Sequence, residues 1–263
     1  MYENLIDMKT NLIDFMDERL SFTVSSRDIW RYSSESVMKY LKTEYMYCRT
    51  DRIRSVFGHT ADYSPLYGGR PYLSKNALTD RQIAELEEAG IGIALTLTNH
   101  FFNEDKYRET IPLLQKNHKK INSVICTNDE LAIRIRNDYP EYRLKASLIK
   151  NINTIDKIDS ALKIYDSIVI PMDKNDDDEF LKSIQKKDRI ILFGNASCAY
   201  TCPQRSCYVG ISRGEEQSTC SKGRIPRDNK GYVFFDVKKF LSLGFDQIKL
   251  IPGASKKRFW KDK

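Results

Sequence analysis

From about residue 52 onward, the chain alternates between two hydrophobic patterns. Short runs rich in β-branched residues are separated by longer stretches in which apolar residues recur every three or four positions. The first pattern predicts buried strands and the second predicts amphipathic helices. The predicted strands are 53–57, 91–98, 121–127, 143–149, 167–171, 189–193 and 247–251, and the predicted helices are 79–89, 105–117, 128–137, 154–165 and 177–186.

Strands that alternate with helices across short links predict a parallel sheet with right-handed crossovers. These strands, with one more expected near residues 20–30 or 231–235, fit an α/β fold of the (β/α)8 TIM-type barrel, complete or distorted. A doubly wound open sheet is the alternative. The sequence has no G-x-G-x-x-G motif to support that alternative.

Residues 1–50 are polar and carry apolar residues at helical spacing, such as Val37 and Leu41. Ser33 or Ser34, followed by Glu35, is expected to begin the second helix of this region. We therefore predict an N-terminal helical extension over 1–50 and a barrel domain over 51–263. Within the barrel, the sequence from Thr79 to Gln82 matches a capping box, which predicts a helix start.

Polar residues follow several predicted strands. Asn128 and Asp173 are interpreted as helix caps, because Asn and Asp are common at strand–helix joints. Asn99 and His100 precede two aromatic residues instead of a helix. Because the carboxyl ends of barrel strands surround one mouth, where active sites are built, such residues are candidates for function. The candidate catalytic residues are Asn99, His100 and Asn195, and His59 is a candidate substrate-binding residue.

Two segments are too long to be simple connectors, and long loops in compact domains are usually functional. The first, residues 58–78, contains Gly68, Gly69 and the candidate substrate-binding residue Arg70. The second, residues 195–232, contains most of the cysteines. Both follow predicted strands, so we expect both at the same mouth of the barrel.

Four of the six cysteines form a C-x3-C-x4-C-x12-C pattern inside a Cys-rich insertion, residues 195–235. They are Cys198, Cys202, Cys207 and Cys220. Converging thiolates bind a 4Fe–4S cluster or zinc, and the spacing, which lacks a C-x2-C knuckle, leaves both open. Cys126, in an apolar run, is interpreted as a core residue, whereas Cys48 is either a core residue or a replacement for Cys220 as a ligand.

Composition supports metal binding over disulfides. The chain is 41% hydrophobic and 30% charged, has no apolar run as long as a membrane span, and begins with acids where a signal peptide would carry lysines. We therefore expect a cytoplasmic protein without a membrane partner, in a compartment where thiols stay reduced. The net charge of +7 favours a nucleic acid or nucleotide partner, with Arg205 and Arg213 as candidate substrate-binding residues.

The order of these features resembles a known family. A series of βα units, a strand ending in Asn195, the cysteines, and then the segment LGFDQIKLIPG at 243–253 is similar to a divergent member of the collagenase-like peptidase family. In that family, a segment like G-v-d-s-l-K-I-E-G-R follows the cluster cysteines. The resemblance covers roughly residues 90–254. The present chain has Ile251, Pro252 and Gly253 where the family has Glu-Gly-Arg, so roles of those residues do not transfer.

The better understood members of that family resemble oxygen-independent hydroxylases that hold a 4Fe–4S cluster on four cysteines. They act on ubiquinone precursors, tRNA or rRNA, with prephenate implicated as oxygen donor. The resemblance implies cluster ligation by the four cysteines, hydroxylation of a nucleobase, and a prephenate-like donor. A partner subunit or a homo-oligomer is also expected. The alternatives are a zinc-stapled binding barrel and a peptidase, although the H-E-x-x-H motif of zinc peptidases is absent from the sequence.

Overall fold

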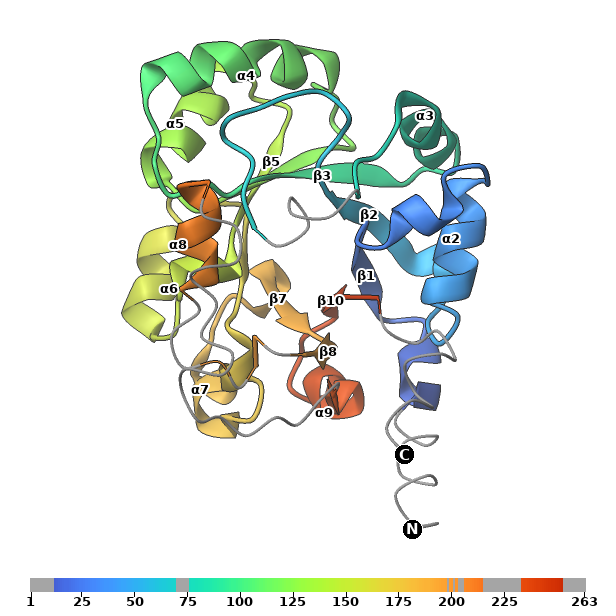
Figure 1. Cartoon of the computed structure of the whole chain (residues 1–263). Coiled ribbons are helices and arrows are strands. Elements are labelled where there is room, and N and C mark those ends of the chain that lie inside the picture. The colour runs from blue at the N-terminus through green and yellow to red at the C-terminus, as the bar shows by residue number, and fades with distance from the viewer. Residues whose placement is uncertain are drawn as a thin grey trace.

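A computed structural model of the chain describes residues 12–69, 76–197, 199–200, 202, 206–214 and 233–252. Within these residues, parallel strands form a closed barrel in the order β1-β10-β7-β6-β5-β4-β3-β2 (Figure 1). The strands are β1 (Ser21–Ser25), β2 (Ile53–Gly58), β3 (Gly92–Leu97), β4 (Ser123–Cys126), β5 (Arg143–Ala146), β6 (Ser167–Val169), β7 (Ile190–Phe193) and β10 (Gln247–Leu250). The predicted TIM-type barrel is confirmed, and the open doubly wound sheet is excluded.

Helices lie around the outside of the barrel, as Figure 1 shows. The α-helices are α2 (Val37–Glu44), α3 (Asp80–Glu88), α4 (Glu104–Lys116), α5 (Asp129–Asp138), α6 (Ile155–Ala161), α7 (Asp178–Ser183), α8 (Cys207–Ser212) and α9 (Val237–Ser242). The 3-10 helices are η1 (Asp14–Met16), η2 (Ile29–Tyr32), η3 (Thr50–Arg52), η5 (Leu148–Lys150), η6 (Met172–Lys174) and η7 (Lys187–Arg189). In the part of the chain described, no helix has both the length and the apolar character needed to cross a membrane.

Helix starts show how local sequence sets these elements. The capping box of α3 is present: the Gln82 N–H donates to Thr79 Oγ1 at 3.3 Å, and the Thr79 N–H donates to Gln82 Oε1 at 3.0 Å. Asn128 caps α5, as expected. Asp177, not Asp173, caps α7. Helix α2 starts later than predicted, after Ser36, whose hydroxyl accepts the Met38 N–H at 3.1 Å. Glu85 from α3 accepts further hydrogen bonds from Ser36 and Val37.

The N-terminal region differs from the predicted helical extension. Strand β1 lies within residues 1–50 and closes the barrel, with Val24 opposite Leu250 of β10 and opposite Val56 of β2. Its five residues alternate between polar and apolar side chains, which is a strand pattern too short to stand out beside helical stripes. The missing strand expected near 20–30 or 231–235 is therefore at 21–25.

The second of those positions forms a strand outside the barrel. Strand β9 (Val233–Phe234) pairs antiparallel with β8 (Asn195–Ala196), so the two ends of the Cys-rich insertion meet in a small sheet. The Phe235 N–H also donates to Gly194 O at 2.9 Å, which extends this contact toward β7. The insertion thus leaves the barrel after β7 and returns to the same place before α9.

The barrel interior is unusually polar. The outward-facing residues of the strands, such as Val24 and Leu144, belong to the large apolar core beneath the helices. The interior holds a small separate cluster, Phe57, Ala94 and Ile125. Polar side chains share that interior and are listed here: Thr23, Ser55, Lys145 and Lys249. TIM barrels usually fill this space with branched aliphatic residues. The polar side chains found here line cavities at the two ends of the barrel.

Candidate active site at the mouth of the barrel

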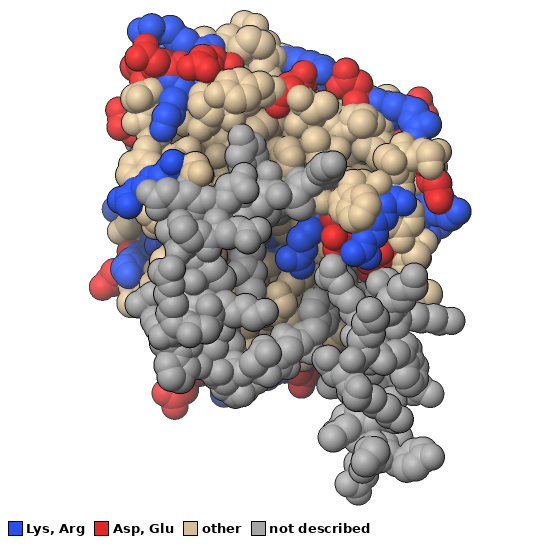
Figure 2. Space-filling model, in the orientation of Figure 1, with Lys and Arg blue, Asp and Glu red and all other residues tan. Residues whose placement is uncertain are grey.

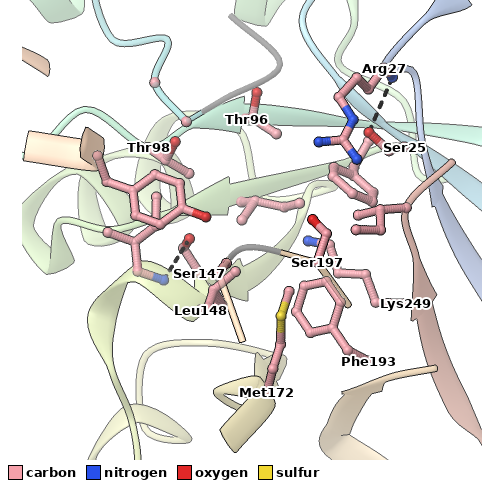
Figure 3. A pocket seen from close by; sticks show the side chains of 18 residues that line it. Ser25, Arg27, Thr96, Thr98, Ser147, Leu148, Met172, Phe193, Ser197 and Lys249 are labelled. Atoms are coloured by element: carbon pink, nitrogen blue, oxygen red, sulfur yellow. Dashed lines mark hydrogen bonds between the residues drawn. The ribbon is translucent and has the colours of Figure 1, made fainter. Parts of the chain in front are cut away.

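A pocket opens at the carboxyl ends of the barrel strands (Figure 3). Residues at or just beyond the ends of β1, β2, β3, β5, β7 and β10 line it. Its polar lining consists of hydroxyls and two cations: Ser25, Thr96, Thr98, Ser147, Ser197, Arg27 and Lys249. No carboxylate is found among the described residues that line it. The pocket therefore suits a small ligand that is anionic and accepts or donates hydrogen bonds.

Both long loops contribute to this pocket, as the sequence predicted. Gly68 and Gly69 come from the first loop, and Ser197, Ala199 and Tyr208 come from the second. The first loop lies flat against the end of β3, because the Gly68 N–H donates to Thr96 O at 3.2 Å. A Cβ on Gly68 would lie 2.7 Å from the backbone nitrogen of Asn99, so only glycine permits this approach.

Asn99 lies at the edge of the mouth, but its side-chain nitrogen and oxygen both form hydrogen bonds with backbone groups. Its Nδ2 donates to Pro65 O at 3.0 Å and to Ser212 O at 3.3 Å. Its Oδ1 accepts the Phe101 N–H at 2.8 Å. The side chain thus joins the first loop to α8 and does not line the pocket.

His100 and Arg213 lie beside Asn99. His100 Nδ1 is 3.0 Å from Ser212 Oγ, which also accepts the His100 N–H at 3.2 Å. Partial burial lowers the pKa of His100, so the neutral ring is favoured at pH 7. The Arg213 guanidinium lies 5.6 Å from the ring centre of Phe101. The structure therefore brings together Asn99, His100 and Arg213 next to α8, outside the pocket lining.

Asn195 and His59 occupy two other places. Asn195 is fully buried, and its Nδ2 donates to the Tyr47 hydroxyl at 2.7 Å and to Ile251 O at 3.0 Å. Its Oδ1 accepts the Ile251 N–H at 2.9 Å. The Asn195 side chain therefore joins its own segment to those of Tyr47 and Ile251. His59 is buried against Tyr67, and burial lowers its pKa to about 4, which keeps the imidazole neutral. Arg70 and Arg205 lie outside the described residues.

Two of the predicted metal ligands can be placed. Cys202 and Cys207 are both buried, and Cys207 begins α8 directly before the pocket residue Tyr208. Cys198 and Cys220 lie outside the described residues. Where side chains are described, no group of three or more His, Cys, Asp and Glu residues is placed to hold a metal. Soft sulfur donors suit zinc or an iron–sulfur cluster, so the two described thiols fit the chemistry of either.

The remaining cysteines have the properties of core residues. Cys126 lies in β4, and burial raises its pKa to about 12. Burial likewise raises the pKa of Cys48 to about 12, and its Sγ donates to Tyr45 O at 3.4 Å. Both thiols therefore stay protonated, whereas a metal ligand is a thiolate. This supports the core interpretation of Cys126 and favours the core interpretation of Cys48.

The most distinctive pocket residue is one to which the sequence assigned no role. Lys249 is 5% exposed, and its Nζ lies 3.9 Å from the ring centre of Phe57 and 5.8 Å from that of Phe193. Burial and the nearby Lys145 lower its pKa to about 7. Burial also lowers the pKa of Lys145 to about 8, and its Nζ donates to Ser55 Oγ at 3.4 Å. A lysine between two apolar residues of a predicted strand was the available signal.

The positive net charge is not concentrated in one region of the described surface. Figure 2 shows basic and acidic side chains interspersed over the described part of this face, without one continuous basic patch. Ion pairs account for part of the mixing; for example, Lys116 contacts both Asp62 and Asp80. Apart from Arg213, the basic residues of the Cys-rich insertion lie outside the described residues. The electrostatic argument for nucleic acid therefore stays a prediction.

The fold and the pocket define a (β/α)8 barrel protein with a cavity where enzymes of this fold place their active sites. Among solved structures, the chain is similar to one described as the structure of the U32 peptidase Mk0906. The TM-score is 0.61 at 11% identity, over 89% of this chain and 93% of that one. At this identity the likeness shows a shared fold. No protein-family model and no curated protein matches the sequence.

Proposed function

We propose that this protein is an iron–sulfur enzyme of the cytoplasm that modifies a nucleobase in RNA, DNA or a nucleotide, by oxygen-independent hydroxylation. In this proposal Cys198, Cys202, Cys207 and Cys220 hold a 4Fe–4S cluster. The observation that carries it is the position of the Cys-rich insertion. Ser197 and Ala199, on either side of Cys198, line the pocket, and so does Tyr208, next to Cys207. A cluster on these cysteines would therefore lie beside the bound substrate.

The chain's own residues suggest how the two reactants are held. A bound cluster supplies one-electron chemistry. Arg27 and Lys249 provide the positive charge that a prephenate-like carboxylate donor requires, and the hydroxyls of Thr96, Thr98 and Ser147 can orient its oxygens. A nucleobase can stack on an aromatic face, such as that of Tyr208. The neutral His100 at the edge of the mouth can accept a proton.

The first test is metal content. The protein is purified without oxygen, its visible spectrum is recorded, and its iron, sulfide and zinc are measured. We expect a brown protein with about four irons per chain, bleached by dithionite. The variants Cys202→Ala and Cys207→Ala lose this chromophore, whereas the matched control Cys126→Ala, which removes a thiol from β4, keeps it.

Two results would overturn this assignment. One zinc per chain without a chromophore would indicate a zinc-stapled barrel that binds nucleic acid or a partner. A chromophore that survives in Cys202→Ala and Cys207→Ala would mean that other residues hold the cluster. Base analysis of RNA from cells lacking the protein, with gel filtration to detect a partner subunit or homo-oligomer, then addresses the substrate and the assembly.

A peptidase is the second candidate, because Ser212 and His100 form a close pair. The geometry argues for a structural pair. Ser212 Oγ donates to Tyr208 O at 3.1 Å and accepts the His100 N–H, and the side chain is 8% exposed. A hydroxyl nucleophile needs a path to its substrate. If Ser212→Ala abolished cleavage of a denatured protein substrate that the wild type degrades, the peptidase would replace the hydroxylase.

A further inference from the structure

The lining of the pocket combines an amine and a guanidinium, and no described carboxylate lies among it. Lys249 and Arg27 both point into the pocket in Figure 3, from the end of β10 and from the segment after β1. Arg27 Nε is buried and has no hydrogen-bond partner among the described residues. No described carboxylate lies within ion-pair distance of Lys249 or lines the pocket. A buried cation without a counter-ion is costly, so this arrangement favours a ligand that supplies the missing anion.

We propose that Lys249 captures the carbonyl group of a small 2-oxo carboxylic acid as a Schiff base, while Arg27 binds the carboxylate of the same molecule. The inference goes beyond the proposed hydroxylase and does not need a cluster, because imine formation requires no metal. It concerns a second chemical capability of the same pocket. Arg27 offers the planar donor pair that carboxylates prefer.

The surroundings of Lys249 favour the neutral amine that attacks the carbonyl carbon and can also stabilise the protonated imine that forms. Its pKa of about 7 leaves a large neutral fraction at pH 7, and only the neutral amine attacks a carbonyl carbon. The faces of Phe57 and Phe193 lie beside Nζ and stabilise a cation at that point. The protonated imine is such a cation, so the rings that hold the ammonium group also hold the product.

The step balances without an oxidant or reductant. The Nζ lone pair forms a bond to the carbonyl carbon, and a proton moves from nitrogen to the former carbonyl oxygen to give a carbinolamine. That oxygen leaves as water after taking up one further proton, and the nitrogen lone pair completes the C=N bond. Ser197 and Thr98 are among the hydroxyls that line the pocket and can exchange these protons with the ligand or with water; Thr98 Oγ1 is buried and makes no hydrogen bond within the described residues.

The test is reductive trapping. The full-length protein is incubated at pH 7 with pyruvate as the probe and with cyanoborohydride, which reduces an imine to a stable secondary amine. Intact mass and peptide mapping then count and locate the adducts. We expect the main adduct on Lys249, above any labelling of Lys145 and of the N-terminal amine, because its pKa of about 7 is lower than their values of about 8. A surface lysine with the ordinary pKa of about 10.4 is neutral in only roughly one of a few thousand molecules at pH 7.

Three variants sharpen the result. Lys249→Arg keeps the charge but cannot form an imine, so the adduct is lost. Lys145→Arg is the matched control, because Lys145 lines the cleft at the opposite end of the barrel and its change should leave the adduct in place. Arg27→Gln should lower trapping of pyruvate about tenfold, the loss of one charge-assisted pair, while leaving trapping of neutral acetaldehyde unchanged.

The wild-type peptide map decides the matter even if Lys249→Arg fails to fold. Adducts spread over surface lysines, or no adduct at all, would overturn the proposal. Equal labelling of wild type and Lys249→Arg would do the same. An adduct on Lys249 that Arg27→Gln does not weaken would retain the amine chemistry and overturn the role of Arg27. Each result can be obtained whether or not iron is present, so failure here and failure of the iron–sulfur proposal are distinguishable.

Discussion

At the scale of single residues, Asn195 shows how a polar side chain at a strand end can serve the structure alone. Its amide contacts Tyr47, 148 positions earlier, and Ile251, 56 positions later. These bonds use both the carbonyl and the amino group, and the residue is fully buried. Because buried polar groups are costly when they lose their partners, Asn195 is a key residue for stability at the mouth.

We therefore predict that Asn195→Ala lowers the free energy of unfolding by about 2–3 kcal/mol, since it leaves the Ile251 backbone groups and the Tyr47 hydroxyl without this partner. Urea denaturation measures the change. Asn137→Ala is the matched control, because Asn137 is exposed, and it should change stability by less than about 0.5 kcal/mol. Equal effects of the two substitutions would contradict the bracing role.

The candidate residues show which part of such a site a sequence reveals. The order of strands places Asn99, His100 and Asn195 at the mouth, and the structure has them there. Their partners are not predictable from the chain, because Pro65, Ser212 and Tyr47 come from segments that are distant in sequence. Lys249 was missed for a related reason. A lysine in a strand is ordinary on a surface, and only barrel closure makes it a buried group.

At the scale of elements, patterns of hydrophobic residues predicted the barrel strands from β2 onward and helices α3 to α7, with errors at the ends, but did not predict β8, α8 or α9. The predicted strand 143–149 is shorter in the structure, because Leu148–Lys150 turns into η5 and carries pocket residues. Strand β1 was hidden, since only Phe22 and Val24 of its five residues are apolar. Local signals are thus strongest where an element is long or is capped by its own side chains.

The contribution of a helix cap to stability can be tested at the start of α3. We predict that Thr79→Ala lowers stability by about 1 kcal/mol, because the N–H of Gln82 loses its acceptor at the start of the helix. Thr79→Ser keeps a hydroxyl at the same position and should retain most of the stability. Thermal denaturation followed by circular dichroism compares the three proteins. A loss as large in Thr79→Ser as in Thr79→Ala would mean that methyl packing, not capping, is the contribution of Thr79.

At the scale of the whole molecule, the barrel is a shell whose interior carries two lysines instead of a full aliphatic filling. Lys145 lies toward one end and Lys249 toward the other, and each lines a different cavity. Their pKa values of about 8 and 7 are lowered by burial, so protonation of either group is less favourable in the folded chain than in the unfolded one. This couples the stability of the barrel to pH.

The direction follows from proton binding. Between the lowered pKa values and the ordinary lysine value of about 10.4, the unfolded chain binds more protons, so stability from these groups rises with pH. The penalty is fully present below about pH 7 and is relieved as the pH approaches 10. We predict that Lys145→Met reduces this rise by roughly 2 kcal/mol between pH 7 and 9.5.

Urea denaturation at the two pH values measures the effect. The control is Lys42→Met, because Lys42 is exposed on α2, and it should leave the pH dependence unchanged. If wild type and Lys145→Met had the same pH dependence, Lys145 would titrate in the folded protein as it does in the unfolded chain. In that case its burial would not be the cause of a lowered pKa.

The position of β10 in the barrel has a consequence for synthesis on the ribosome. This strand is the last of the eight to be made, yet it pairs with β1 and β7 and so joins the first strand to the rest. Until it emerges, β1 and β7 have open edges, which invite wrong pairing with other chains. The hydrogen bonds between the Asn195 side chain and the Ile251 backbone also cannot form until Ile251 has been made. The barrel can therefore close only after its final strand has left the ribosome, and the mouth forms at that last step.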